Sequence, residues 1–279
     1  MTCQDKIGII AGFSKILSDN QCFIIESAQY GDLETGKFFM RTVFESREEN
    51  IDKDYLLDKF SGFIADYAMD FTIKDFDYRP RTLILVSKYE HCLRDLLHRA
   101  NKSILDIDVQ AIISNHQNAQ KLANFYNIDF QYLPILQKTP EAKLQQEAAI
   151  LKLVADLDID LVILARYMQI LSPDFVKKLE SKIINIHHSF LPSFKGAKPY
   201  HQAHKRGVKL IGATAHFVTD KLDEGPIIEQ EVNRIEHTAT IQDMVNIGYG
   251  IESEVLIKAV KYISENRVFI NGDKTVIFK

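Results

Sequence analysis

A cluster of polar side chains closes an apolar run in the second half of the sequence. In KIINIHHSFLP, Asn185, His187 and His188 follow residues that are typical of a buried β-strand. Residues two apart in an extended chain share a face, so Asn185 and His187 are expected to point the same way. An amide donor beside a titratable imidazole can stabilise a carbonyl oxygen that becomes negative, and the imidazole can deliver a proton. A purely structural role for the histidines is the alternative at this point.

A second segment, GATAHFVTDKLDEGPIIEQ, combines an apolar strand with a polar turn. The pattern predicts a strand over residues 213–218 that contains His216, then a turn that contains Asp223, and then a returning strand. The carboxylate of Asp223 could simply cap backbone amides of that turn. It gains a chemical role only if the turn folds over the strand end that carries His187.

A third segment, ARYMQILSPDF, runs from a strand end through a loop to a capped helix. Met168, Ile170 and Leu171 on this loop could cover a flat heterocycle, although ordinary core packing would use the same residues. A metal centre has less support, because His201 and His204 lack an H-E-x-x-H pattern. We therefore expect no metal and no cofactor.

Composition excludes several classes of protein. The chain of 279 residues has a net charge of −4, whereas nucleic-acid binders usually carry a basic surplus. No apolar run approaches the roughly 20 residues of a membrane span, and the N-terminus has no signal-peptide pattern. The cysteines Cys3, Cys22 and Cys92 show no CxxC spacing, which indicates a reduced compartment and buried apolar thiols. We expect a cytoplasmic protein that binds neither nucleic acid nor membrane.

Residues 1–78 read as a small α/β module. The expected elements are a helix capped by Asp5, strands at 22–29, 38–44 and 71–76, and a helix that contains Leu56 to Ile64. One more strand at the start would complete a ferredoxin-like βαββαβ order. The chain begins at Met1-Thr2-Cys3, where that strand should end. The first strand is therefore expected to be truncated, or the natural start lies earlier.

Residues 79–279 form the second expected domain, after a linker at DYRPR. Apolar strands alternate there with helices, which predicts a Rossmann-like, doubly wound parallel sheet with its active site at the carboxyl ends of the strands. The expected strands are 82–87, 109–114, 161–166 and 182–187, and the expected helices are 90–100, 117–126, 140–156, one after Ser172-Pro173, and 241–265 with a Thr240–Asp243 capping box.

Together the three polar segments resemble the formyltransferase fold of folate-dependent formyl-transfer enzymes. That family carries an N-I-H-x-S-x-L-P strand end and an H-F-x-x-x-x-x-D-x-G-P-I-I loop, and both stand in this sequence in the same order. The resemblance implies that Asn185 holds a formyl oxygen and that His187 acts as general acid or oxyanion stabiliser. The resemblance also implies that Asp223 either orients a reacting group or removes a proton from it.

The same resemblance implies a binding site for the pterin ring of the folate. The residues carried over to that site are Met168, Gln169, Ile170, Leu171, His216, Val218, Thr219 and Asp220. Lys195, Lys198 and Arg166 are possible contacts for the glutamate tail of the folate.

Within this family the chain is most similar to the formyltetrahydrofolate deformylase subgroup. HHS in place of the more common HPS, SFKGAKPYHQA and SKYEHCLRDLL carry that similarity, and CQDKIGIIAGFSKIL with TGKFFMRTVF resembles an ACT module. The resemblance implies hydrolysis of 10-formyltetrahydrofolate, which releases formate for purine biosynthesis and balances the one-carbon pool. It also implies a homodimer or homotetramer, and an amino-acid effector, glycine or methionine, at the ACT module.

Two other functions stay open. Glycinamide-ribonucleotide formyltransferase resembles the same domain but opens it with a glycine-rich loop that can hold a phosphate. Here VSKYEHCLRDLL has no glycine, and Glu90 would repel a phosphate. Only 56 residues follow Asp223, too few for the barrel of a methionyl-tRNA formyltransferase. Transfer to an amine acceptor is thus the second interpretation, and a non-catalytic amino-acid sensor is the third.

Overall fold

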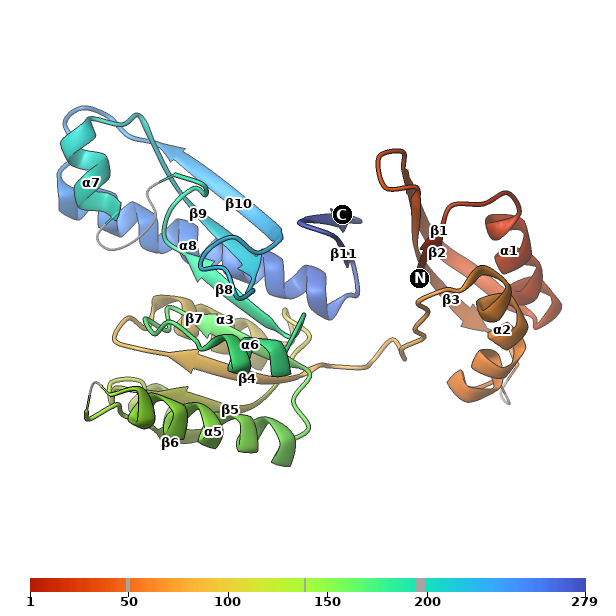
Figure 1. The fold of residues 1–279 in the computed structure, drawn as a ribbon, viewed down its shortest axis with the longest axis horizontal. Helices are drawn as coiled ribbons and strands as arrows, with labels where there is room; N and C mark the ends of the chain where they lie inside the picture. Colours follow the sequence, from red (N-terminus) through yellow and green to blue (C-terminus); the bar gives the residue numbers. More distant parts are fainter. Residues whose placement is uncertain (49–50, 138, 194–198) are drawn as a thin grey trace. The chain divides into compact units, whose positions relative to one another are not determined.

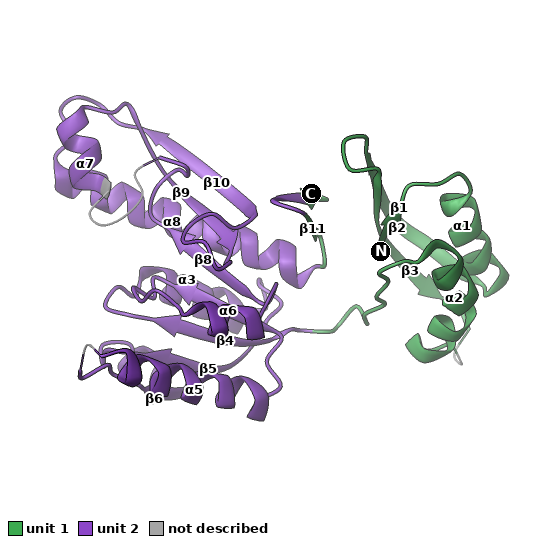
Figure 2. Cartoon of the chain, in the orientation of Figure 1, with its two compact units in different colours: residues 1–78, 266–271, 276–279 green, residues 79–265, 272–275 purple. Residues whose placement is uncertain are grey.

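The computed structural model describes residues 1–48, 51–137, 139–193 and 199–279, which divide into two compact units. Unit 1 consists of Met1–Tyr78, Asn266–Asn271 and Val276–Lys279, and unit 2 of Arg79–Glu265 and Gly272–Thr275 (Figure 2). The sequence pattern placed residues 79–279 together in the second domain. The structure instead groups two short C-terminal segments with the N-terminal module.

Unit 1 contains a three-stranded antiparallel sheet with the order β1-β3-β2. Its elements are β1 (Thr2–Gln4), α1 (Ile9–Asp19), β2 (Cys22–Asp32), β3 (Lys37–Ser46) and α2 (Lys53–Tyr67). A single bridge joins Asp70 to Thr2 on the free side of β1. With that bridge counted as the last strand, the order is 4-1-3-2, which fits a ferredoxin-like module.

Two sequence expectations for unit 1 are wrong. The strand over residues 71–76 does not form, because β1 is only three residues long and offers its neighbour little backbone to pair with. Phe71 and Ile73 instead pack their side chains against the core of the module. Asp5 does not cap α1. The N-cap is Gly8, whose φ of 97° is one that glycine adopts without steric cost.

The C-terminal segments cover the sheet face of unit 1 that the helices leave open. The ring of Phe269, on β11 (Val268–Asn271), packs edge-on against the buried Phe39 at 5.9 Å. Asn271 donates to the Asp32 carboxylate at 2.6 Å. The hairpin continues through Gly272, at φ 63°, into β12 (Lys274–Ile277). The sequence interpretation missed this hairpin, although Asn271-Gly272 is a strong signal for one.

Unit 2 is built on a seven-stranded sheet with the order β10-β9-β8-β7-β4-β5-β6. The strands are β4 (Arg81–Val86), β5 (Asp108–Ser114), β6 (Asp129–Tyr132), β7 (Leu161–Ala165), β8 (Ile183–His187), β9 (Leu210–Phe217) and β10 (Ile227–Arg234). Five strands are parallel, while β9 and β10 form an antiparallel hairpin beside β8. The sheet is thus mostly parallel, as predicted. The short edge strand β6 was not predicted.

Helices cover both faces of this sheet (Figure 1). They are α3 (His91–Asn101), α4 (Gln120–Phe125), α5 (Pro140–Asp156), α6 (Pro173–Lys178), α7 (Pro199–Arg206) and α8 (Ile241–Ser264). Side chains of α5 and α6 share one core with β4, β5, β7 and β8. On the other face α8 packs against α3 and β9. Caps at Thr139, Ser172 and Thr240 form as predicted, so the starts of these helices are set locally.

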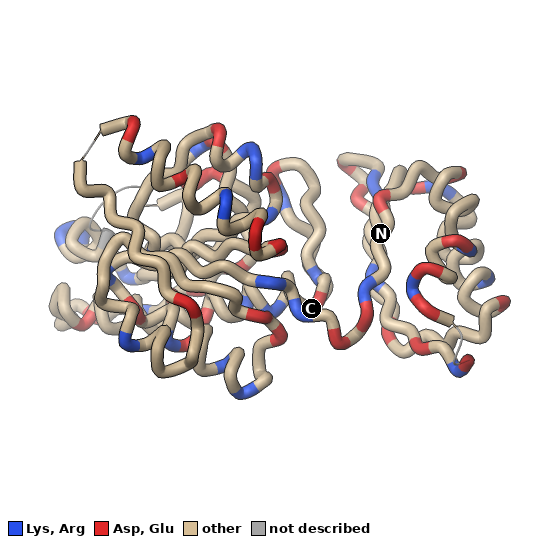
Figure 3. The backbone as a smooth tube through the Cα atoms, turned by 90° about the horizontal axis from the view of Figure 1, so that it is seen from below, with Lys and Arg blue, Asp and Glu red and all other residues tan. Residues whose placement is uncertain are grey.

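Charged residues of both signs are distributed along the described parts of the chain (Figure 3). Figure 3 shows Lys and Arg interspersed with Asp and Glu along the backbone of both units. Among the described residues, no helix is both long enough and apolar enough to cross a membrane.

Candidate active site

Strand pairing brings Asn185 and His216 together. In the antiparallel register of β8 and β9 these two residues are direct partners, so their side chains leave the same face of the sheet. The side-chain nitrogen Nδ2 of Asn185 lies 3.2 Å from Nε2 of His216. His187 is two residues beyond Asn185, and the alternation of the strand brings its ring to that face too. The sequence predicted that Asn185 and His187 share a face, but it did not reveal the pairing with His216.

The turn between β9 and β10 brings Asp223 to the same place. Oδ1 of Asp223 lies 3.3 Å from Nδ1 of His187 and 3.9 Å from Nε2 of His216. Asp223 adopts a left-handed backbone with φ 56°, which aspartate tolerates better than most residues. The turn therefore does fold over the end of β8, as a chemical role for Asp223 requires.

Close packing of the two backbones of the β9–β10 hairpin fixes the position of the turn that carries Asp223. The amide of Phe217 donates to the carbonyl of Pro226 at 2.9 Å. A Cβ atom on Gly225 would lie 1.8 Å from the carbonyl oxygen of Phe217, a distance that no side chain could occupy. Glycine at position 225 thus allows the approach of the two backbones that places Asp223.

Burial and ionic neighbours set the charges in this site. Burial alone would raise the pKa of Asp223, but the hydrogen bond and charge of His187 outweigh it and leave that pKa below its ordinary value. Burial lowers the pKa of His216, which is 2% exposed, so this ring is held neutral. Asp223 is consequently an anion at neutral pH and His216 an uncharged hydrogen-bonding group.

The hydrogen bonds of His216 fix its tautomer and the orientation of Asn185. Nδ1 lies 2.8 Å from the carbonyl oxygen of Phe217. A carbonyl only accepts, so Nδ1 carries the proton and Nε2 presents its lone pair. That lone pair accepts one N–H of the Asn185 side-chain amide. His216 was expected to contact the pterin, and the structure adds this contact with Asn185.

One atom of this site has no partner among the described residues. Nε2 of His187 is buried and makes no hydrogen bond, while Nδ1 of the same ring faces Asp223. Buried polar atoms in folded proteins are nearly always satisfied, and exceptions are common where a ligand is to bind. This nitrogen therefore marks the position at which a reacting oxygen or nitrogen would sit.

The loop after β7 presents apolar side chains at the same edge of the sheet. Met168 is 50% exposed and Ile170 64% exposed, which is unusual for apolar side chains in a fixed loop. The amide of Met168 donates to Oγ of Ser87 at 3.0 Å, and the amide of Ser172 donates to the Glu147 carboxylate at 2.8 Å. Both ends of the loop are therefore anchored. Leu222, beside Asp223, is also 58% exposed and was not predicted.

The other predicted folate contacts differ in burial. Leu171 and Val218 pack partly against the core of unit 2. Gln169 and Thr219 are half-buried, and Asp220 is exposed. Lys195 and Lys198 lie outside the described residues. Arg166 is only 6% exposed and pairs with Glu252, so its guanidinium is not available to an extended glutamate tail.

A separate group of possible metal ligands lies on the other side of His188. His91, Cys92 and Glu252 place one ligand atom each within 4.8 Å of one another. The guanidinium of Arg166 lies 3.3 Å from the Glu252 carboxylate and already supplies positive charge there. Burial raises the pKa of the Cys92 thiol, which disfavours the thiolate that a metal would need. The donor set therefore does not fit a metal ion.

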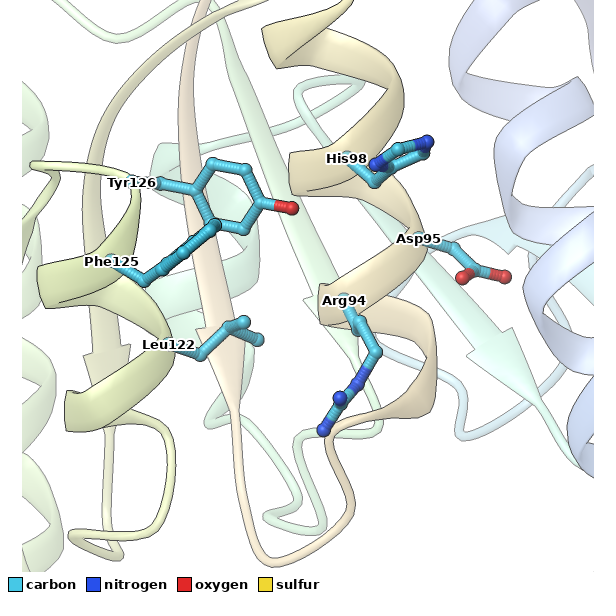
Figure 4. A pocket seen from close by; sticks show the side chains of 6 residues that line it. All are labelled: Arg94, Asp95, His98, Leu122, Phe125 and Tyr126. Carbon is cyan, nitrogen blue, oxygen red and sulfur yellow. The ribbon is translucent and has the colours of Figure 1, made fainter.

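Two cavities lie apart from the catalytic candidates. One, of about 290 Å³, is mostly apolar and opens beside His188 and Tyr200, against Leu210, Ile211 and Val232. The other, of about 470 Å³, is a groove between α3 and α4 that contains Arg94, His98 and Phe125 (Figure 4). Neither cavity is lined by Asn185, His187 or Asp223.

Comparison with known proteins shows the family to which this fold belongs. Residues 80–260 match the formyl transferase family. A formyltetrahydrofolate deformylase of Corynebacterium sp. (strain P-1) is 44% identical over all of this chain and 96% of its own length. The crystal structure of a formyltetrahydrofolate deformylase from Burkholderia mallei is 46% identical, with a TM-score of 0.94 over 100% of this chain and 97% of that one.

A more distant structure shares only the larger part of the chain. Glycinamide ribonucleotide transformylase 1 from Symbiobacterium toebii is 26% identical, with a TM-score of 0.68 over 75% of this chain and 99% of that one. The doubly wound sheet and the Asn185, His187 and Asp223 side chains at its strand ends thus indicate the class of folate-dependent formyl-transfer proteins. The chain belongs to the formyl transferase family and, at full length, to its formyltetrahydrofolate deformylases.

Proposed function

We propose that this chain hydrolyses 10-formyltetrahydrofolate to tetrahydrofolate and formate, with Asn185, His187 and Asp223 as its catalytic residues. The observation that carries the proposal is the 3.3 Å approach of Asp223 to His187, beside a buried imidazole nitrogen that has no other partner. A general base, a general acid and an amide donor are then within reach of one carbonyl.

The reaction is the addition of water to the formyl carbon, followed by loss of N10. Asp223 accepts a proton from the attacking water as the C–O bond forms. The amide of Asn185 and the imidazole of His187 stabilise the negative charge on the formyl oxygen. His187 then delivers a proton to N10 as the C–N bond breaks, and the proton that Asp223 took from water passes back to His187. Tetrahydrofolate leaves, and the formic acid formed leaves as formate after it loses its proton to solvent. Met168, Ile170 and Leu222 supply apolar surface against which the pterin ring can lie.

Purified protein and 10-formyltetrahydrofolate test this function directly. In water labelled with ¹⁸O, the label is expected in formate, because the hydrolytic oxygen comes from solvent. Asn185→Ala and His187→Ala are each expected to lower kcat by about 10² or more, because an oxyanion donor or the general acid is lost. Near-normal turnover in variants with unchanged circular dichroism would overturn the assignment.

The ACT-like module of unit 1 supports a proposal of regulation. An amino acid, with glycine and methionine as candidates, would bind this module in a homodimer or homotetramer and change the rate of hydrolysis. Titration of each amino acid against initial rate and melting temperature tests this point. If neither quantity responds to any amino acid, the regulatory proposal is wrong, while the hydrolytic one is unaffected.

A further inference from the structure

The crevice at the topological switch point of the sheet is filled by the chain's own charged side chains. The chain runs from β4 outward to β5 and β6, and then crosses to β7 and β8 on the other side of β4. Doubly wound folds bind ligands outside the carboxyl ends of the strands at such a point. In this chain Arg166, directly after β7, and His91, at the start of α3, meet there with Glu252 from α8.

Glu252 is the centre of this cluster and is completely buried. Its Oε2 lies 2.7 Å from Nε2 of His91 and 3.3 Å from Nη1 of Arg166, while Oε1 accepts the hydroxyl of Tyr200 at 2.6 Å. Burial by itself would raise the pKa of Glu252, but the hydrogen bond of His91 and the charge of Arg166 reverse the direction. The carboxylate is therefore ionised, and the cluster holds a buried ion pair.

A glycine on helix α8 leaves room for Tyr200 beside Glu252. Gly248 lies one turn before Glu252, so both residues face the same way. A Cβ atom on Gly248 would lie 2.0 Å from the hydroxyl of Tyr200. Glycine inside a helix is less favourable than alanine, and here it lets Tyr200 reach Glu252.

The buried guanidinium of Arg166 is only partly hydrogen-bonded. It is 6% exposed, with a left-handed backbone at φ 64°, and its guanidinium lies 5.3 Å over the ring of Tyr89. Within the described part of the chain, its Nε and Nη1 atoms find no hydrogen-bond partner of good geometry. Buried ion pairs often stabilise a fold less than apolar side chains of the same volume would. Packing alone therefore does not explain why this crevice holds an arginine and a glutamate.

The cluster lies next to the catalytic imidazole. The ring of His188 is 5.2 Å from that of His187 and 6.3 Å from that of Tyr200. Burial, and then the charge of Arg166, lower the pKa of His188 to about 3, so a neutral ring separates the ion pair from the catalytic residues. The buried side chains of Arg166, Glu252 and Tyr200 thus occupy the space beside His188, next to the catalytic imidazole.

We propose that the Arg166–Glu252 pair determines acceptor specificity: it fills the switch-point crevice, so that water and not an amine receives the formyl group. This inference rests on the proposed hydrolysis. In hydrolysis a C–O bond forms as the C–N10 bond breaks. In transfer, an amine nitrogen would form the new C–N bond and lose a proton, while N10 gains one. Both routes use the same Asn185, His187 and Asp223, and they differ only in whether the amine fits.

Two double variants separate an open crevice from a filled one. Arg166→Gly/Glu252→Ala removes the side chains, while Arg166→Met/Glu252→Leu removes the charges and keeps the volume. Each is incubated with 10-formyltetrahydrofolate and excess glycinamide, and formate and N-formylglycinamide are measured by mass spectrometry. Relative to the filled variant, the open variant is expected to raise the ratio of N-formylglycinamide to formate by about tenfold or more.

The outcomes distinguish the two proposals. Wild type that releases no formate would contradict the hydrolytic function itself. Wild type that hydrolyses, beside a folded open variant that makes no more formylated amine than the filled one, would overturn the specificity role. If the open variant fails to fold by circular dichroism, Arg166→Ala/Glu252→Gln is compared with Arg166→Met/Glu252→Gln. This pair differs only in the volume at position 166, and glutamine can still hydrogen-bond to His91 and Tyr200.

Discussion

At the scale of single residues, the catalytic candidates depend on neighbours that have no direct chemistry to perform. Asn185 can present its free N–H only if its other N–H is held, and neutral His216 holds it at 3.2 Å. Asn185, His187 and Asp223 could be predicted as candidates from their motifs. The role of His216 could not, because it follows from a strand register that neither motif contains.

His216 is therefore a positioning residue with a distinct kinetic signature. His216→Phe keeps the volume and removes the acceptor for Asn185, so we expect kcat to fall by about tenfold to a hundredfold while KM changes much less. His216→Gln retains an acceptor and is expected to recover part of the loss. Equal effects of the two variants, or a change confined to KM, would contradict the positioning role.

The two buried neutral histidines also predict how stability depends on pH. The pKa of His188 falls to about 3 and that of His216 is lowered, both first of all by burial, whereas an unfolded histidine titrates near 6.5. Below pH 6.5 these histidines become protonated in the unfolded chain but stay neutral in the folded chain. The free energy of unfolding therefore falls as the pH is lowered. For His188 the loss in the free energy of unfolding should approach about 1.4 kcal/mol for each pH unit below 6.5. His216 contributes in the same direction, and urea unfolding between pH 7 and 5 measures the sum of the two effects. A His188→Gln/His216→Gln variant should show a flatter profile, and an equally steep one would exclude these groups as the cause.

At the scale of elements, the β9–β10 hairpin is the part that assembles the site. Gly225→Ala would place a methyl group 1.8 Å from the carbonyl oxygen of Phe217, and the hairpin must move to relieve that contact. We expect the free energy of unfolding to drop by about 1–3 kcal/mol. We also expect kcat to drop by about tenfold or more as Asp223 leaves His187.

An alanine at an open glycine position provides the control for that variant. Gly250 is exposed on α8, and a Cβ atom there meets nothing within 4 Å. Gly250→Ala should leave kcat unchanged and raise helix stability by up to about 1 kcal/mol. If Gly225→Ala behaves in the same way, the hairpin does not position Asp223.

At the scale of the whole molecule, the C-terminal segments belong structurally to the N-terminal module. Phe269→Ala is expected to lower the free energy of unfolding by about 1–3 kcal/mol, because the buried Phe39 loses an aromatic neighbour on the open face of its sheet. Ile270→Ala, at an adjacent position that is 36% exposed, is the matched control and should have a smaller effect. Urea unfolding measures both, and equal losses would show that the packing of Phe269 is not what joins the segment to unit 1.

What the sequence determined by itself is the set of locally encoded features. Apolar runs, the caps at Thr139, Ser172 and Thr240, and the motifs around His187 and Asp223 each fit within one element and its flanks, so each could be recognised without knowledge of the rest of the chain. Tertiary structure decided the contacts between distant elements. These are His216 against Asn185, Asp223 against His187, Arg166 against Glu252, and Phe269 against Phe39 within unit 1. Such contacts depend on strand register, crossover geometry and close backbone approach, which arise only when the elements pack together.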